Sequence, residues 1–184
     1  MIISRKMSEG KIALRKMARA RVAAIDSAEK ESRSAAIADR VKEHIAVSGA
    51  RVVALYCPIG GEPLVWQLVE ELSKVMSVAL PRVEGDSMNF YCYDPAIMQR
   101  GAYGIMEPMG GEALLPHEID IIVVPGVVFT KSGERMGRGK GYYDKYLSHP
   151  DFRGIKIGVC YSEQLVGSIP VEPHDVRMDY VIYE

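Results

Sequence analysis

The sequence predicts an α/β fold, a three-layer α/β/α arrangement with a mostly parallel central sheet. Two observations lead to this prediction. Short runs of Val and Ile without polar alternation, such as residues 52–56 and 119–124, are typical of strands buried on both faces. Helical segments separate these runs along the chain, as the crossovers of a parallel sheet require. We expect residues 1–184 to form a single domain, because the chain has the length of one domain and no linker-like stretch.

The helices are predicted from apolar residues that recur at helical spacing. Residues 9–25 lack proline and carry apolar side chains on or near one face. A second helix follows Asp26, an acidic cap with a Glu three residues later, and Gly49 ends it. Shorter helices are expected at residues 64–74 and 143–147.

Six strands are predicted from short apolar runs bounded by glycine, proline or polar residues. They cover residues 52–56, 77–80, 88–93, 119–124, 155–161 and 180–183. Pro81 is expected to end the second of them. Ligands of parallel sheets collect in the loops that follow the carboxyl ends of the strands. We therefore look for functional residues in those loops.

The charge balance argues against a nucleic-acid partner. The chain has 23 Lys and Arg against 24 Asp and Glu, a formal net charge of −1. The charge is nevertheless uneven, since residues 1–21 hold seven cations and one anion. A solvated helix face is one explanation of this basic segment, and a local site for a polyanion is another.

The cysteines and the apolar runs indicate a cytoplasmic protein. Cys57, Cys92 and Cys160 are odd in number and far apart, so neither a disulfide framework nor a zinc knuckle is expected. No apolar run approaches the ~20 residues of a membrane span, and no secretory signal is recognisable. We expect no membrane association.

The segment most informative about function is residues 133–144, Gly-Glu-Arg-Met-Gly-Arg-Gly-Lys-Gly-Tyr-Tyr-Asp, after the fourth predicted strand. Its glycines let backbone N–H groups converge on an anion, and Arg135, Arg138 and Lys140 add positive charge. The following helix N-terminus adds a partial positive charge. These features suit a polyphosphate. The segment is neither a Walker A loop, because Gly141 follows Lys140, nor a G-x-G-x-x-G dinucleotide fingerprint.

This segment resembles the signature of the 5-formyltetrahydrofolate cyclo-ligase family, also called 5,10-methenyltetrahydrofolate synthetase. The resemblance is ordered and nearly full length, with residues 135–144 as its most specific part. The weaker blocks are residues 11–15, 56–62, 80–82 and 104–108, Pro125-Gly126, Phe129, Gly133, Gln164, Ile169-Pro170 and His174-Asp175.

The resemblance implies an ATP-dependent ring closure of 5-formyltetrahydrofolate to 5,10-methenyltetrahydrofolate, with release of ADP and phosphate and a requirement for Mg²⁺. In the family, the γ-phosphoryl group is thought to pass to the formyl oxygen and turn it into a leaving group for attack by N10. Such a transfer asks the protein for positioning and charge stabilisation. We expect a monomer whose partners are ATP and 5-formyltetrahydrofolate.

The family's functional residues carry over position by position. The resemblance implies that Arg138 and Lys140 stabilise the transferring phosphoryl group. The implied ATP-binding residues are Lys11, Arg15, Arg135, Met136, Gly137, Arg138, Gly139, Lys140, Gly141, Tyr142 and Tyr143. Asp144 and Asp175 match the family's Mg²⁺-associated carboxylates. The implied contacts of the folate are Cys57, Glu62 and Tyr103.

Neither Cys57 nor His174 is assigned a chemical step. Cys57 has no nearby His in the sequence to activate its thiol. His174 is adjacent to Asp175, and neighbouring side chains of an extended segment point in opposite directions. We therefore expect a positioning role for His174 and no dyad with Asp175.

Three alternatives stay open from the sequence. Residues 133–144 could be a flexible surface loop with solvated cations. The same scaffold could bind ATP and activate another formyl or carboxylate substrate, because a phosphate loop does not fix the second substrate. The protein could instead be a nucleic-acid-binding or regulatory module that uses the basic N-terminal helix, although its net charge argues against this alternative. In addition, Thr130 stands where many relatives have Asp, which predicts a different nucleotide affinity.

Overall fold

The computed structural model describes the backbone of residues 2–101 and 104–184, with side chains described from residue 9 onward. Its central sheet has six strands in the order β10-β9-β6-β1-β2-β3. They are β1 (Val52–Ala54), β2 (Ser77–Glu84), β3 (Ser87–Cys92), β6 (Ile121–Val124), β9 (Ile155–Cys160) and β10 (Tyr180–Tyr183). All neighbours are parallel except β2 and β3. The predicted mixed α/β fold with a mostly parallel sheet is confirmed.

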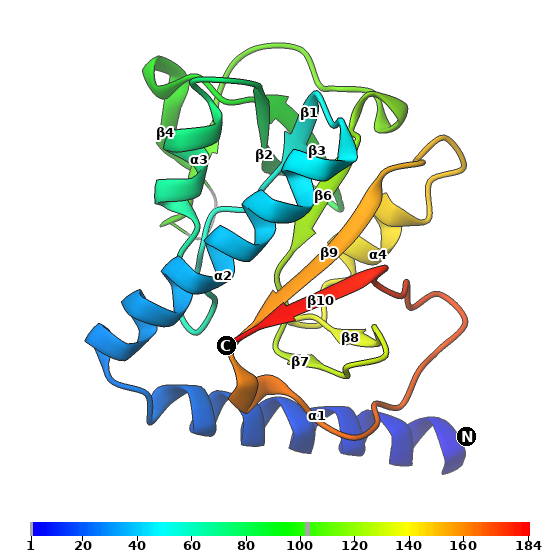
Figure 1. Ribbon diagram of the computed structural model, residues 1–184. Coiled ribbons are helices and arrows are strands. Elements are labelled where there is room, and N and C mark those ends of the chain that lie inside the picture. The colour runs from blue at the N-terminus through cyan, green and yellow to red at the C-terminus, as the bar shows by residue number, and fades with distance from the viewer. Residues whose placement is uncertain (1, 102–103) are drawn as a thin grey trace.

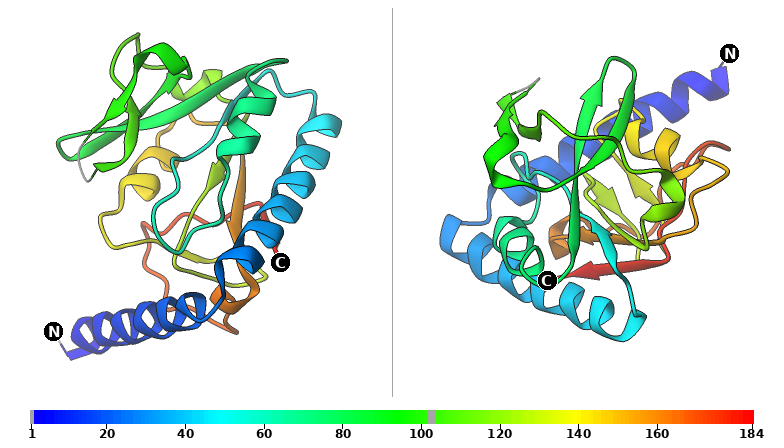
Figure 2. Two further views of the ribbon diagram at one scale, coloured as in Figure 1. Left: turned by 90° about the vertical axis from the view of Figure 1, so that its left-hand side faces the viewer. Right: turned by 90° about the horizontal axis from the view of Figure 1, so that it is seen from above.

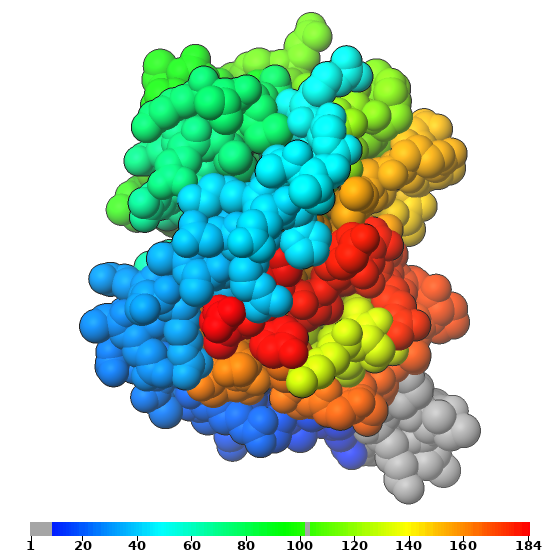
Figure 3. Space-filling model, in the orientation of Figure 1, coloured from blue at the N-terminus to red at the C-terminus, as the bar shows by residue number. Residues whose placement is uncertain are grey.

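Helices cover the two faces of this sheet (Figures 1 and 2). Helices α2 (Ser27–Ser48) and α3 (Trp66–Leu72) pack on one face, where Ile37, Val41 and Leu68 meet the side chains of the parallel strands. On the other face, α4 (Tyr142–Leu147) packs through residues such as Tyr146. Figure 3 shows α2 lying over the first face, with β10 beside it. Burial on both faces explains why the strands read as continuous apolar runs.

The first helix occupies a different place. Helix α1 (Ile2–Ala23) runs past the carboxyl ends of the strands and covers neither face of the sheet (Figure 1). Its Ala18 packs on the short hairpin of β7 (Val128–Phe129) and β8 (Arg135–Met136). The basic helix therefore lies beside the glycine-rich segment, because β8 is part of that segment.

Helix ends agree with the sequence prediction at α2. The Asp26 side chain accepts a hydrogen bond from the Glu29 N–H at 2.8 Å, and Gly49 ends the helix at φ +72°. The expected end of β2 at Pro81 is wrong, since the strand continues to Glu84. Beyond Ala79, β2 has β3 as its neighbour in the sheet while β1 has ended, so Pro81 lies in an edge segment, where a proline is tolerated.

The remaining elements are short and were not predicted. Besides β7 and β8 they are β4 (Met98–Arg100) and β5 (Met106–Pro108), which form an antiparallel pair, and the 3-10 turns Pro95–Ile97, Pro116–Glu118 and Ser162–Gln164. Within the described ranges, no helix combines the length and apolar character needed to cross a bilayer.

Candidate active site

A cavity of about 650 Å³ lies at the carboxyl ends of the strands and brings the predicted residues together. One part of its wall comes from α1, the glycine-rich loop and the segment after Ile169. Another part comes from the loop after β1, from β2 and from β5. Every described residue that the sequence analysis assigned to ATP, folate or metal lines this cavity. Tyr103 lies outside the described residues.

The glycine-rich loop joins β8 to α4. Gly139 has φ +106° and Gly141, the residue before α4, has φ +72°. Side chains at these two positions would be strained, because only glycine adopts such φ values readily. The loop thus turns with its backbone close to the cavity, as an anion cradle requires.

Arg135 is buried beneath this loop, with a side-chain exposure of 3%. Its guanidinium donates to the Asp144 carboxylate at 2.9 Å and to the Pro125 carbonyl at 3.2 Å. It also lies 5.6 Å from the centre of the Tyr143 ring. These contacts tie the end of β6, the start of the loop and the first turn of α4 together.

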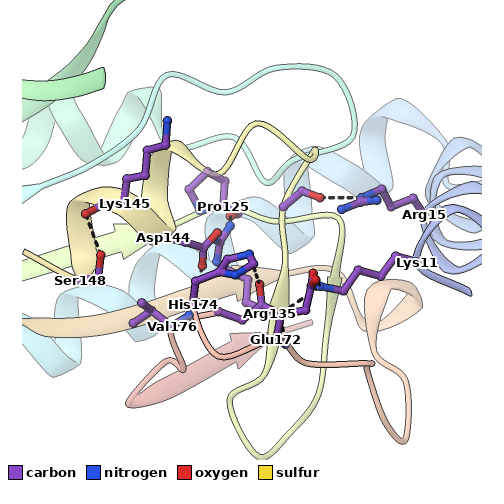
Figure 4. Close-up of polar contacts among 12 residues, drawn as sticks. Lys11, Arg15, Pro125, Arg135, Asp144, Lys145, Ser148, Glu172, His174 and Val176 are labelled. Carbon is purple, nitrogen blue, oxygen red and sulfur yellow. Dashed lines mark hydrogen bonds and ion pairs between the residues drawn. The ribbon is translucent and has the colours of Figure 1, made fainter. Parts of the chain in front are cut away.

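Helix α1 contributes two cations to the cavity (Figure 4). The Arg15 guanidinium donates to the Gly137 carbonyl at 2.8 Å, so α1 holds the loop directly. The Lys11 ammonium contacts the carboxylates of Glu172 at 2.6 Å and Asp175 at 3.0 Å. Lys11 and Arg15 are four residues apart, about one helical turn, and both line the cavity.

A turn near the C-terminus carries the second predicted metal-associated acid. Ligand atoms of Glu172, His174 and Asp175 lie within 4.8 Å of one another. The expectation that His174 points away from Asp175 is wrong: its Nε2 is 3.8 Å from the Asp175 carboxylate, because the segment turns and the Asp175 N–H bonds the Glu172 carbonyl. Burial raises the pKa of Asp175, but the Glu172 N–H and the Lys11 ammonium outweigh burial and the net shift is downward.

Asp144 approaches the same turn. Its Oδ1 accepts the Val176 N–H at 3.2 Å while its Oδ2 accepts from Arg135. Both predicted acids therefore border residues 172–176. Carboxylate oxygens are the ligands that Mg²⁺ prefers, so the chemistry of Asp175 and of the unpredicted Glu172, whose ligand atoms lie together, fits such an ion. Asp144 reaches the same turn through Val176.

Glu62 forms the most informative contact between the two parts of the cavity. Its side chain is 5% exposed, and Oε1 accepts from Arg138 Nε at 3.1 Å. Its Oε2 accepts the Ile59 N–H at 3.0 Å. Arg138 also donates to the Gly60 carbonyl at 2.9 Å. Burial raises the pKa of the Glu62 carboxyl, against the lowering effect of Ile59 and Arg138.

The other predicted residues differ in their surroundings. Burial raises the pKa of the Cys57 thiol to about 12, in agreement with a role as a wall residue and not a nucleophile. Lys140 is exposed at the cavity and forms no ion pair with another described residue. Met136 is buried against α1, and the Tyr142 hydroxyl donates to the Gly85 carbonyl at 3.3 Å.

Sequence reasoning missed Glu172 and Glu107, both of which line the cavity. Glu172 lies three residues before Asp175, a spacing that could have drawn attention to it. Glu107 is a buried acid, 4% exposed, in the block that the sequence analysis quoted without assigning it a role.

The chain is similar in sequence to known proteins of one family. Among curated relatives, the 5-formyltetrahydrofolate cyclo-ligase of Mycolicibacterium smegmatis is 33% identical over 147 residues, 74% of each chain. That of Mus musculus is 26% identical and covers 97% of this chain and 95% of its own.

Solved structures give the same result for the fold. The Aquifex aeolicus 5,10-methenyltetrahydrofolate synthetase superposes with a TM-score of 0.85 at 37% identity, over 94% of this chain and 89% of the other. The Mycoplasma pneumoniae enzyme of the same name gives 0.78 at 28% identity, over 94% and 97%. The sequence profile of the 5-formyltetrahydrofolate cyclo-ligase family matches residues 7–184, and the chain belongs to this family.

Proposed function

We propose that the protein catalyses the ATP-dependent cyclisation of 5-formyltetrahydrofolate to 5,10-methenyltetrahydrofolate, with release of ADP and phosphate. The observation that carries the proposal is the 3.1 Å contact between Arg138 of the glycine-rich loop and Glu62. It brings a polyphosphate cradle and a buried carboxylate into one cavity, so that two substrates bound there can be held side by side.

The nucleotide phosphates bind along residues 137–141. Loop N–H groups and the exposed Lys140 face the phosphates, while Arg15 holds the loop through the Gly137 carbonyl. Lys11 stands beside the same space. Charge on the transferring group is stabilised by Arg138, once it turns from Glu62, and by Lys140. Arg135 supports the loop from beneath, since its guanidinium is already engaged by Asp144 and Pro125.

The acids near residues 172–176 would hold Mg²⁺. Asp144 and Asp175 are the proposed ligands, and Glu172 extends the set. When bound, the ion neutralises phosphate charge and orients the triphosphate. Lys11 contacts both Glu172 and Asp175 and offsets one of their two negative charges.

The folate occupies the apolar part of the cavity, along Val83, Met88 and Ile105. Glu62 accepts hydrogen bonds from the donor-rich edge of the pterin. The γ-phosphoryl group passes to the formyl oxygen, N10 attacks the formyl carbon, and phosphate leaves as the ring closes. The protein accelerates these steps by orientation and charge stabilisation, because it offers no nucleophile of its own in this scheme.

The test is the appearance of 5,10-methenyltetrahydrofolate absorbance from 5-formyltetrahydrofolate, with ATP or Mg²⁺ left out in turn. We expect product only when all three are present, and one ADP per product. If folded protein binds ATP but makes no product, the enzyme acts on another formyl or carboxylate compound. We further propose that the enzyme is a cytoplasmic monomer, which its three free cysteines support as far as the compartment is concerned.

A further inference from the structure

Glu107 is a buried carboxylate in the folate part of the cavity that the proposed function leaves without a task. It lies in β5, is 4% exposed and lines the cavity together with Cys57 and Glu62. Its carboxylate rests on the backbone of Gly101, at the base of the loop between β4 and β5. A Cβ built on Gly101 would overlap the carboxylate.

No described cation neutralises this acid. From β2, the Arg82 guanidinium is bound to Glu84 and the Pro108 carbonyl and lies 3.8 Å from the Tyr91 ring centre. Arg82 therefore acts on Glu107 only as a nearby charge.

The other groups packed around Glu107 offer no counterion either. From β4, the strand paired with β5, Arg100 donates to the Gly104 carbonyl at 3.3 Å. From the loop after β1, the Cys57 thiol is neutral, with a pKa of about 12. Burial raises the pKa of Glu107, with the Val83 N–H and Arg82 acting against it. A carboxylate that is buried without a counterion is costly, unless a bound ligand supplies a donor.

The proposed reaction contains a proton that needs an acceptor. When the N10 lone pair bonds to the formyl carbon, N10 still carries its hydrogen and becomes positively charged. Phosphate cannot leave to give the methenyl product until that hydrogen is lost. A buried carboxylate with a raised pKa in the same cavity is a suitable base for this transfer.

The shape of the folate determines which of the two carboxylates, Glu62 or Glu107, contacts the pterin edge and which lies near N10. The pterin edge that carries the amino group and N3–H lies opposite the carbon that bears the N10 side arm. If Glu62 binds that edge, N10 points to another part of the cavity wall. Glu107 is the other buried acid among the described lining residues, and its charge helps to raise the pKa of Cys57, which lies in the Glu62-bearing loop.

We propose that Glu107 is the base that accepts the N10 proton during ring closure, an inference that rests on the proposed function. The N10 lone pair forms the new C–N bond, and the N10–H proton passes to the Glu107 carboxylate. The electron pair left on N10 then forms the C=N bond while the C–O bond breaks, and phosphate leaves with the electron pair of the broken C–O bond. Glu107 later releases the proton to solvent.

The test compares Glu107→Gln with wild type in rapid-quench single turnover, following ADP and methenyl product separately. In wild type the two products form together. In Glu107→Gln we expect ADP to form within about threefold of the wild-type rate and ring closure to slow by about 10²- to 10⁴-fold, the range of general-base catalysis. The wild-type rate should fall as the pH drops through the raised pKa of Glu107, and this acid limb should be absent in Glu107→Gln.

Two further variants separate chemistry from structure. Gly101→Ala should slow ring closure as well, because its methyl group displaces the Glu107 carboxylate without removing its charge. The matched control is Glu112→Gln, which changes an exposed acid a few residues away and should behave as wild type. Melting temperatures show whether each variant folds, and Gly101→Ala carries the test if Glu107→Gln does not fold.

Clear results would overturn the proposal. One is a rate of ring closure in Glu107→Gln within threefold of the wild-type rate. The other is an equal slowing of ADP formation and of product formation in Glu107→Gln, with the acid limb of its pH–rate profile unchanged. A wild-type enzyme that makes no methenyl product would instead refute the proposed function itself, before any variant is compared.

Discussion

The ion pair between Glu62 and Arg138 predicts that a change on the folate side strengthens nucleotide binding. In the structure, Arg138 donates to Glu62 at 3.1 Å and to the Gly60 carbonyl at 2.9 Å. Its guanidinium therefore faces the folate-side loop. A nucleotide that uses Arg138 must first draw it away from these partners. Glu62→Gln keeps the size of the side chain and removes the charge.

The size of the effect follows from the contact that is weakened. A hydrogen bond to a charged group contributes about 1.5–3 kcal/mol and a neutral one about 0.5–1.5 kcal/mol. Glu62→Gln should therefore make the release of Arg138 easier by roughly 1–1.5 kcal/mol, or about 5- to 10-fold in nucleotide affinity. Folate affinity should fall in the same variant, since the amide no longer offers a carboxylate to the pterin.

Calorimetric titration with a non-hydrolysable ATP analogue, without folate, measures this effect. Glu163→Gln is a matched control, because Glu163 also pairs with an arginine, Arg33 at 2.8 Å, but does not line the cavity. We expect the control to bind the analogue as wild type does. If Glu62→Gln binds the analogue equally well or more weakly than wild type, the ion pair does not restrain Arg138 and the reasoning fails.

Three other variants test the remaining contacts. Lys140→Ala should lower turnover by about 10²- to 10³-fold with an unchanged melting temperature, because Lys140 is exposed; near-normal turnover would remove it from the mechanism. Asp144→Asn should raise the Mg²⁺ concentration needed for half-maximal rate, and an unchanged metal titration would contradict the metal assignment. The free energy of unfolding of this variant in urea should also fall by about 3 kcal/mol, because Arg135 loses its buried partner. Lys11→Met should weaken nucleotide binding. Because the pKa of Asp175 is lowered in the folded protein, its carboxylate contributes stability above pH ~4 that is lost in acid. The free energy of unfolding, measured in urea, should therefore fall less between pH 6 and 3 in this variant than in wild type. Equal losses would mean that Lys11 does not lower the pKa of Asp175.

Much of the fold follows from the sequence because its signals are local. The long helix α2 was recognisable from its period and its caps, and the central strands from continuous apolar runs. The hairpins β4–β5 and β7–β8 were missed because strands of two or three residues are too short to show a period. Pro81 was misread because the partners of a strand, which decide whether it tolerates a proline, are not visible in its own sequence.

The site divides in the same way. The glycine-rich loop could be recognised because its glycines and cations are consecutive. The contact of Arg15 with the Gly137 carbonyl joins residues 122 positions apart, and that of Arg138 with Glu62 joins residues 76 positions apart. Such pairs are created by the topology, which brings α1 and the loop after β1 to the same end of the sheet. The sequence shows which side chains are present but not which of them meet.

The three cations of the loop illustrate what burial adds to a motif. Arg135, Arg138 and Lys140 stand close together between glycines, and all three were predicted to bind ATP, with Arg138 and Lys140 singled out for the transferring phosphoryl group. In the fold, Arg135 is enclosed and paired with Asp144, Arg138 is half-exposed and paired with Glu62, and Lys140 is exposed at the cavity without an ion pair among the described residues. The cost of redirecting each cation toward a phosphate therefore falls from Arg135 to Lys140. Substituting Arg135 should chiefly reduce stability, substituting Arg138 should alter the coupling between the two substrates, and substituting Lys140 should chiefly reduce the rate.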